Sequence, residues 1–136
     1  MVCIFCGSQT KVVNSRHNVK LNQTWRRHKC LKCASLFTSV ESFDLSKSIL
    51  VESSDGKLNN FSINKFRYSI YQSLSHQKKA LDNSTAITNT IVAQLLKSLK
   101  NPVIKRDDLV KTAAKILKRF DRAAYVHYLA HHSSDN

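Results

Sequence analysis

The stretch that decides the fold is Thr24–Cys33, TWRRHKCLKC, where a Cys-x-x-Cys pair directly follows a run of basic residues. A second pair with the same spacing, Cys3 and Cys6, lies at the start of the chain. Two residues between cysteines allow a tight turn that aims both sulfurs at one ion, and two such turns complete the tetrahedral thiolate shell of structural zinc. The sequence therefore predicts one structural Zn²⁺ bound by Cys3, Cys6, Cys30 and Cys33 in a small zinc ribbon.

Other interpretations of the four cysteines are two disulfides, four unrelated thiols or a catalytic zinc site. The opening residues, MVCIFCGSQT, contain no basic leader and no long apolar stretch, so we expect a cytoplasmic protein without a membrane span. Paired cysteines in a reducing cytosol are more often metal ligands than disulfides. A catalytic zinc would leave one position open for water, which four thiolates do not.

The charge of the chain is large and unevenly distributed. The 136 residues include 22 Lys and Arg against 9 Asp and Glu, a formal net charge of +13. The first 40 residues contain no acid and seven cations, which are Lys11, Arg16, Lys20, Arg26, Arg27, Lys29 and Lys32. Polyanions are the natural partners of such a segment. We place the end of this first domain at residue 44, where acidic residues have begun to appear.

Most of the cations must face solvent, because a ribbon this small is nearly all surface. Lys and Arg reach phosphates, and Arg also binds guanine edges, so duplex DNA is the expected partner. Trp25 is expected to cap the small core, with stacking on a base as the alternative. The candidate DNA-binding residues are Arg16, Trp25, Arg26, Arg27, His28 and Lys29.

The second segment begins with the pattern of a β-hairpin. Ile49–Val51 and a short run ending at Phe61 are expected strands, separated by an Asp55-Gly56 turn signal. Apolar residues at helical spacing follow, with Ser62 as the candidate N-cap of the first helix. A second helix is expected from Ser84 to Leu99, before Pro102.

A third helix is expected from an N-cap at Asp107 to about His131, along one unbroken apolar stripe. The fold class is therefore α+β, with the zinc ribbon followed by a mainly helical domain. His127, His131 and His132 cluster near the end, but no acid completes a metal-binding helix pattern. Paired carboxylates, a Gly-rich phosphate loop and a nucleophile with its base are missing from the sequence, so we expect no enzyme.

Several stretches together resemble the NrdR-type repressors of ribonucleotide reductase genes. CIFCGSQTKVVNSR and RRHKCLKCASLFTSVE are similar to the cysteine pairs, arginine run and following strand of that family. FSINKFRYSI resembles the start of the first helix of its ATP-cone domain, and LVKTAAKILKRFDRAAYVHYLA its closing helix.

The resemblance implies a zinc ribbon that binds promoter boxes and a second domain, residues 45–132, that binds ATP or dATP and forms homo-oligomers. Residues 133–136 are expected to be a disordered tail. A cytoplasmic, nucleoid-associated repressor is the function that this resemblance implies. Oligomers would gain DNA affinity by presenting several ribbons at once.

The chain departs from the family at the turn that resembles its nucleotide-binding turn. Two cations expected there are replaced by Ser53 and Ser54, and Glu52 adds a negative charge. The resemblance places nucleotide binding on the residues Ser53, Ser54, Asp55, Gly56, Lys57 and Lys65. The alternative function is an assembly module, responsive or insensitive to nucleotide, with weak or RNA-directed binding.

Overall fold

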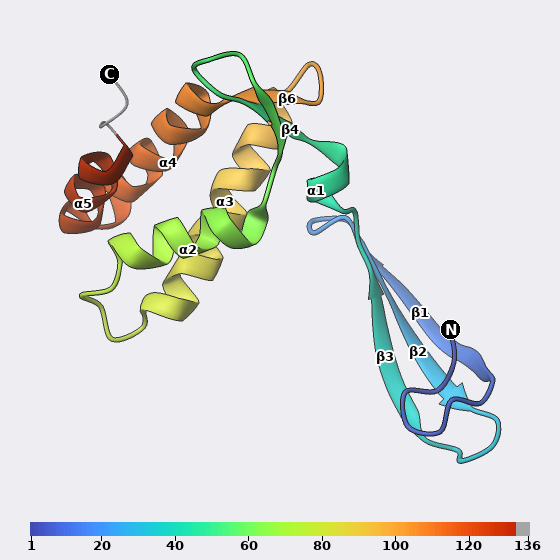
Figure 1. Ribbon diagram of the computed structural model, residues 1–136. Coiled ribbons are helices and arrows are strands. Elements are labelled where there is room, and N and C mark those ends of the chain that lie inside the picture. The colour runs from blue at the N-terminus through green and yellow to red at the C-terminus, as the bar shows by residue number, and fades with distance from the viewer. Residues whose placement is uncertain (133–136) are drawn as a thin grey trace. The chain divides into compact units, whose positions relative to one another are not determined.

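Residues 1–132, which the computed structural model describes, divide between Asp44 and Leu45 into two units, each with its own secondary structure (Figure 1). The first unit is a β-ribbon and the second is mainly helical with a small sheet, so the α+β class is confirmed. The expected disordered tail, residues 133–136, lies outside the described residues.

The first unit is an antiparallel sheet in the order β1-β2-β3. Its strands are β1 (Thr10–Asn18), β2 (Gln23–Cys30) and β3 (Leu36–Glu41). The basic run of the opening stretch forms the central strand, β2. Because β2 is paired on both sides, its side chains are held in fixed register.

A β-bulge interrupts β1 between Val12 and Asn14. In a regular strand, Lys11 and Arg16 would point to opposite faces, because they are five residues apart. The extra residue, Val13, shifts the alternation by one, so both basic side chains lie on the same face of the sheet.

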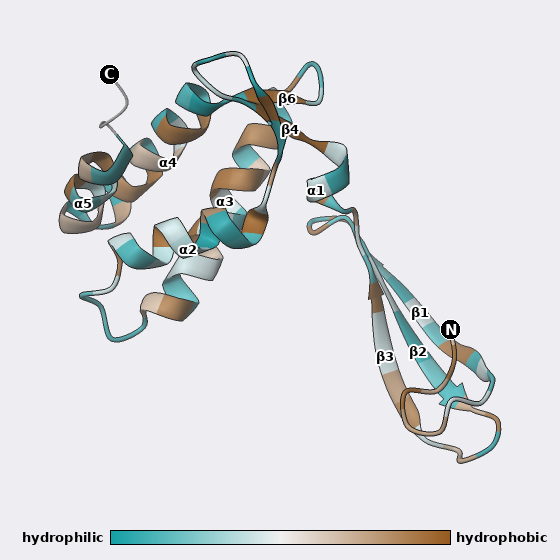
Figure 2. Ribbon diagram, in the orientation of Figure 1, coloured by the Kyte–Doolittle hydropathy of each residue, from teal (hydrophilic) through white to brown (hydrophobic). Residues whose placement is uncertain are grey.

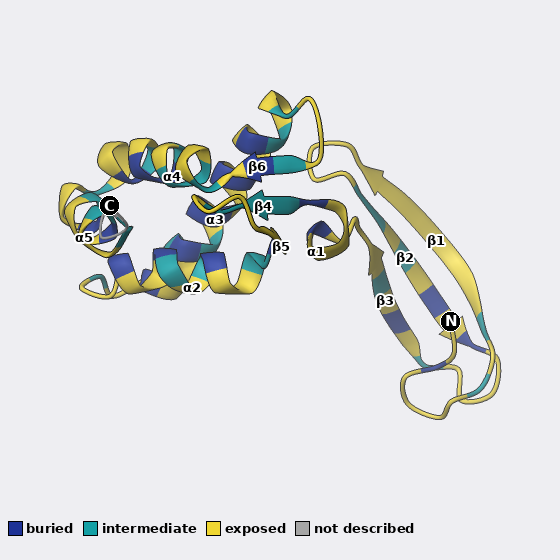
Figure 3. Cartoon of the chain, turned by 45° about the horizontal axis from the view of Figure 1, so that its top comes forward, coloured by how far each residue is buried: buried dark blue, intermediate teal, exposed yellow. Residues whose placement is uncertain are grey.

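The core of the first unit is small and consists largely of its cysteines. Only four of its side chains are buried, those of Cys3, His28, Cys30 and Phe37. Figure 3 shows β1 as almost wholly exposed, with narrow buried bands on β2 and β3. A sheet with so little apolar burial depends on another source of stability, and a bound metal is the usual one in units of this size.

The second unit contains a three-stranded sheet in the order β5-β4-β6. A short helix, α1 (Leu45–Ser48), leads into β4 (Leu50–Glu52), which pairs antiparallel with β5 (Leu58–Asn60) and parallel with β6 (Val103–Lys105). The expected hairpin is confirmed, with Gly56 in its turn at φ +79°. The strand β6 was not expected from the sequence.

Four longer helices complete the second unit: α2 (Ile63–Ser73), α3 (Ala80–Ser98), α4 (Arg106–Phe120) and α5 (Arg122–His132). Ser62 caps α2 as expected, since its Oγ accepts a hydrogen bond from the N–H of Lys65 at 3.3 Å. The expected start of the second helix at Ser84 is wrong by four residues.

The single third helix expected from the apolar stripe is also wrong. The chain leaves the helical conformation at Asp121, which separates α4 from α5. Its Oδ1 accepts a hydrogen bond from the N–H of Ala124 at 3.0 Å and so satisfies a free donor at the start of α5. Asp107 lies within the first turn of α4, whose N-cap residue is Lys105.

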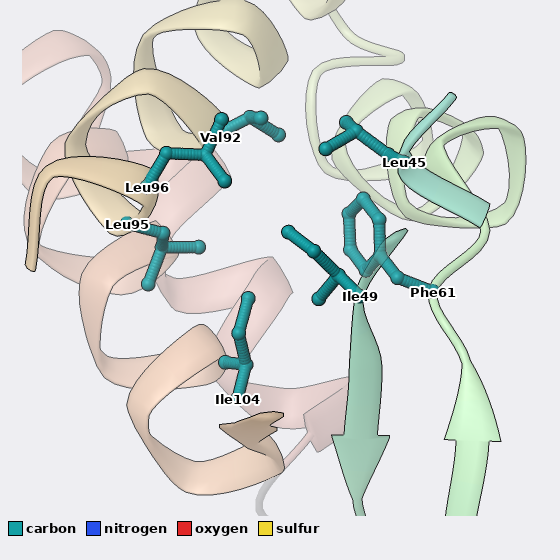
Figure 4. Close-up of a pocket in the computed structure, with 7 residues that line it drawn as sticks. All are labelled: Leu45, Ile49, Phe61, Val92, Leu95, Leu96 and Ile104. Atoms are coloured by element: carbon teal, nitrogen blue, oxygen red, sulfur yellow. The ribbon is translucent and has the colours of Figure 1, made fainter. Parts of the chain in front are cut away.

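The core of the second unit is apolar and continuous. Side chains from the sheet and all five helices enter it, including the fully buried Ile70, Leu74, Ile91 and Leu117. Figure 2 shows hydrophobic and hydrophilic stripes along the helices, as expected for amphipathic packing. A small pocket is lined only by apolar side chains, those of Leu45, Ile49, Phe61, Val92, Leu95, Leu96 and Ile104 (Figure 4).

Candidate metal centre and nucleic-acid surface

Two tight turns bring the four cysteines together. The first turn is closed by hydrogen bonds from the N–H of Cys3 to Ser8 O at 2.8 Å and from the N–H of Gly7 to Cys3 O at 2.9 Å. The second is closed by a hydrogen bond from the N–H of Cys30 to Ser35 O at 2.9 Å. Both turns contain a residue with positive φ, Gly7 at +72° and Ala34 at +58°. We call these turns the two knuckles.

The four sulfurs all lie within 4.8 Å of one another. Cys3 Sγ is 3.7 Å from Cys33 Sγ, and Cys6 Sγ is 3.5 Å from Cys30 Sγ. A disulfide needs about 2.05 Å between its sulfurs, so the structure contradicts that interpretation. Four thiols gathered around one point form the donor set of a closed, structural zinc site, and the residues present fit Zn²⁺.

Backbone and hydroxyl groups around the sulfurs act in favour of the thiolate forms. The N–H of Phe5 donates to Cys3 Sγ at 3.4 Å, and the N–H groups of Lys32 and Cys33 donate to Cys30 Sγ at the same distance. At Cys30 the N–H groups of Cys33 and Lys32 lower the pKa, but burial and the neighbouring thiols outweigh them and raise it. Hydrogen bonding to Ser35 lowers the pKa of Cys33 to about 6. Donors of this kind orient metal ligands and stabilise their negative charge.

One face of the ribbon carries most of its exposed cations. Residues that are directly opposite in an antiparallel sheet share a face. Arg16 pairs with Trp25, Asn14 with Arg27 and Lys11 with Lys29, so the alternation along β2 puts all of these on one side. We call this side the cationic face, and its exposed members are Lys11, Arg16, Trp25, Arg27 and Lys29.

Lys11 and Lys29 are directly opposite on the cationic face. Like charges in that position repel and destabilise a sheet. A polyanion bound across the face would remove this repulsion. Trp25 is 49% exposed, so its expected role as a core cap is wrong and the ring is free to contact a ligand.

The structure places two of the predicted DNA-binding residues on the opposite face. Arg26 forms an ion pair with Glu41 across β2 and β3. His28 is buried, with its ring stacked on Phe37 at 4.9 Å between centroids and its Nε2 2.7 Å from Ser39 Oγ. His28 is therefore a packing residue of the ribbon, because its ring is not accessible to a ligand.

Sequence reasoning missed Lys11 as a member of the cationic face. In a regular strand the five-residue spacing between Lys11 and Arg16 would put them on opposite faces, and only the bulge at Val13 reverses that. A run of two β-branched residues carries no bulge signal, so this placement could not be read from the sequence.

The turn between β4 and β5 is closed by its own polar groups. The N–H of Ser53 donates to Lys57 O at 2.9 Å, and Asn59 Nδ2 donates to Ser53 Oγ at 3.4 Å. Lys57 Nζ lies 3.1 Å from Asp55 Oδ2. Hydrogen bonds from the backbone and side chain of Lys57 lower the pKa of Asp55 below its ordinary value, at which the carboxyl is already ionised at neutral pH.

These observations leave the turn with little positive charge for binding a triphosphate. A phosphate entering the turn would meet an ionised carboxylate that has already engaged the only cation of the segment from Glu52 to Asn60. Ser54, like Gly56, is exposed in the turn, and Ser hydroxyls lack the charge-assisted strength of Lys or Arg. Lys65 is exposed in the first turn of α2.

The histidines near the end of α5 have separate surroundings. The rings of His127 and His131 lie 4.7 Å apart between centroids. His132 Nε2 is 2.8 Å from Ser69 Oγ of α2. The described part of the chain has one group of three or more metal-ligand side chains, the four cysteines.

Among the described helices, none combines the length and apolar character of a transmembrane segment.

A four-cysteine ribbon joined to a helical unit defines a zinc-ribbon protein, and its cationic face is typical of nucleic-acid-binding regulators. Residues 1–41 match the family described as "Transcriptional repressor NrdR-like, N-terminal domain". The chain is 31% identical over 129 residues to the transcriptional repressor NrdR of Chlamydia pneumoniae, covering 94% of this chain and 83% of that protein. The NrdR repressors of Chlamydia felis and Chlamydia muridarum are 30% identical over the same share of this chain.

The chain therefore belongs to the NrdR family of transcriptional repressors. The resemblance noted in the sequence is confirmed, and so is the prediction that the chain is not an enzyme, since these relatives are named repressors. Membership also implies DNA as a partner.

Proposed function

We propose that the chain represses ribonucleotide reductase genes by binding promoter boxes through the cationic face of its ribbon. The observation that supports this proposal is the gathering of Lys11, Arg16, Arg27 and Lys29 on one exposed side of a rigid sheet. Phosphate contacts from such a face position a protein on the duplex, and its Arg side chains can read guanine edges. The four cysteines would hold a structural Zn²⁺, which fixes the end of the sheet.

The two faces of β2 provide a matched pair of variants for testing the DNA contact. Arg27→Ala removes a cation from the cationic face, whereas Arg26→Ala removes one that Glu41 already engages on the other side. The slope of log K against log salt changes by about 0.9 for each phosphate that the protein no longer neutralises. We expect Arg27→Ala to reduce the slope by roughly one, Arg16→Ala with Arg27→Ala by roughly two, and Arg26→Ala to leave it unchanged.

Fluorescence anisotropy with a labelled duplex at several salt concentrations measures these slopes. Equal effects of Arg26→Ala and Arg27→Ala would refute the assignment of the face. Affinity that stays constant as salt rises would refute DNA binding through cations altogether. Competition with single-stranded RNA tests the alternative of an RNA-directed ribbon, in which Trp25 would stack on unpaired bases.

The proposed target genes are tested by selecting bound sequences from a pool of random duplexes, without choosing a binding site in advance. Zinc-loaded protein is incubated with random duplexes, and the bound fraction is sequenced with ATP, with dATP and without nucleotide. Enrichment of paired boxes that also occur upstream of ribonucleotide reductase genes is the expected result. Enrichment of boxes found elsewhere would contradict the proposed target.

The second unit is proposed to assemble copies of the chain, which raises DNA affinity by presenting several ribbons at once. Regulation of this assembly by ATP or dATP stays a prediction from the resemblance. A nucleotide shifts an assembly equilibrium only by its difference in affinity between the forms.

The closed β4–β5 turn favours a second candidate, an assembly unit that is insensitive to nucleotide. The Asp55–Lys57 ion pair and the serines at 53 and 54 are the observations behind it. Light scattering with and without ATP and dATP separates the two candidates. A change of mass with nucleotide, abolished by Lys65→Ala, would contradict the insensitive form.

A further inference from the structure

Three of the four residues between the paired cysteines have exposed apolar side chains. Ile4 and Phe5 in the first knuckle are each 66% exposed, and Leu31 in the second is 60% exposed. We call these three residues the apolar tip. Singly exposed apolar residues are common on proteins, but a cluster on a unit this small indicates a contact surface.

The metal centre brings the apolar tip together from two distant parts of the sequence. The two knuckles share one group of sulfurs, and the N–H of Leu31 donates to Gln9 O at 3.1 Å, which ties the second knuckle to the segment behind the first. Figure 1 shows both knuckle loops at the same end of the ribbon, and Figure 2 shows the N-terminal loop there as hydrophobic.

The ribbon itself makes little use of these side chains. Its buried residues are Cys3, His28, Cys30 and Phe37, and the apolar tip is not among them. The knuckles are closed by backbone hydrogen bonds that do not depend on the side chains at positions 4, 5 and 31. Packing of the first unit therefore does not account for three large apolar residues at these positions.

The charges around the apolar tip select its partner. Lys32 lies beside Leu31 in the second knuckle, Lys29 directly precedes Cys30, and Lys11 is opposite Lys29. A ribbon of a second copy is a poor partner for the apolar tip. Its own seven cations within residues 1–40 would repel Lys11, Lys29 and Lys32. DNA combines both required properties, since phosphates line each groove and apolar side chains can wedge against base steps in the minor groove.

We propose that the apolar tip enters the minor groove and packs against a base step, next to phosphates bound by Lys11, Lys29 and Lys32. This inference rests on the proposed DNA-binding function and extends the contact from the cationic face around the metal end of the ribbon. The free energy needed to unstack a base step depends on its sequence. A side chain wedged there therefore favours easily opened steps and adds sequence preference without hydrogen bonds to bases.

Truncation of the tip tests the proposal without removing any charge. The variant carries Phe5→Ala and Leu31→Ala, and the control is Val19→Ala, a residue that is 79% exposed in the loop between β1 and β2. Duplex affinity is measured at several salt concentrations, and zinc content is measured on each protein. We expect the double variant to bind about tenfold more weakly with an unchanged salt slope, and the control to bind within about twofold of wild type.

A measurement on the unaltered protein keeps the test independent of folding. A duplex of the selected box is prepared with 2-aminopurine at successive positions, and its fluorescence rises where a base is unstacked. Wild-type protein is expected to raise the signal at one step of each box, and the double variant is not.

The outcomes separate this inference from the proposed function. Wild-type protein that binds DNA with a salt-dependent slope but raises no signal would overturn the wedge and leave the repressor intact. Unchanged affinity of a zinc-loaded double variant would also overturn the wedge. Wild-type protein that binds no duplex at all would overturn the proposed function itself.

Discussion

At the scale of single residues, the two knuckles differ at the position that takes a positive φ. Gly7 occupies it in the first knuckle and Ala34 in the second. A side chain in the left-handed region is strained by about 1–2 kcal/mol, whereas glycine adopts it freely. The positive φ of Ala34 therefore lowers the stability of the folded ribbon.

Ala34→Gly is expected to stabilise the ribbon by roughly 0.5–1 kcal/mol, because it removes this strain at some cost in unfolded-chain entropy. Gly7→Ala provides the converse test. A Cβ at Gly7 would meet no atom within 4 Å, so only backbone strain should act, and the variant should lose about 1 kcal/mol. Competition for Zn²⁺ with a coloured chelator measures both changes. Weaker zinc binding by Ala34→Gly would contradict this account.

At the scale of secondary-structure elements, Asp121 holds the junction of α4 and α5 to the loop before α3. Besides the N–H of Ala124, its carboxylate accepts hydrogen bonds from His76 Nε2 at 2.8 Å and Gln77 Nε2 at 2.5 Å. The N–H of Ala124, then the His76 and Gln77 side chains, hold the pKa of Asp121 well below its usual range.

Asp121→Ala is expected to destabilise the second unit by about 1 kcal/mol, the usual effect of losing an N-cap. Asp121→Asn should keep the hydrogen bond from the N–H of Ala124, but its amide nitrogen cannot accept from His76 or Gln77, so its loss of stability should lie between zero and that of the Ala variant. Urea unfolding followed by circular dichroism measures both. A loss for the Asn variant as large as for Ala would show that the charge, not the cap, is what matters.

The depressed pKa of Asp121 also predicts how the second unit responds to acid. A carboxyl whose folded pKa lies below its unfolded value of about 3.9 contributes stability that is complete above that value. The contribution is lost as pH falls from about 4 toward the folded pKa. Unfolding measured between pH 6 and pH 2 should therefore show a steeper acid loss for wild type than for Asp121→Asn. Parallel curves would contradict the linkage.

The elements that the sequence predicted are those with local signals. The cysteine spacing indicated the ribbon, the Asp55-Gly56 pair indicated the hairpin, and Ser62 indicated the start of α2. The break between α4 and α5 has a signal in the sequence, because Asp121 is a favoured N-cap residue. The continuous apolar stripe across Asp121 nevertheless predicts a single helix. Strand β6 could not be predicted, because three residues gain strand structure only by pairing with β4, about fifty residues earlier.

At the scale of the whole molecule, the two units are stabilised in different ways. The second has a continuous apolar core, whereas the first buries four side chains, two of them cysteines. The candidate DNA surface depends on distant pairings as well as on local sequence. The basic composition correctly indicated DNA as the partner that family membership implies. The face of the sheet on which Arg26, His28 and Lys11 lie is set by strand register and by the bulge in β1, which the sequence does not reveal.

The central claim is that a metal bound by the cysteines folds the ribbon and so presents its cations to DNA. Duplex affinity of the full chain is measured before chelation, after chelation and after Zn²⁺ is restored, with helical circular dichroism followed in the same samples. The account predicts that chelation abolishes DNA binding, that zinc restores it, and that the helical signal persists, because the core of the second unit contains none of the cysteines. Chelated protein that binds the duplex as tightly as before would contradict it.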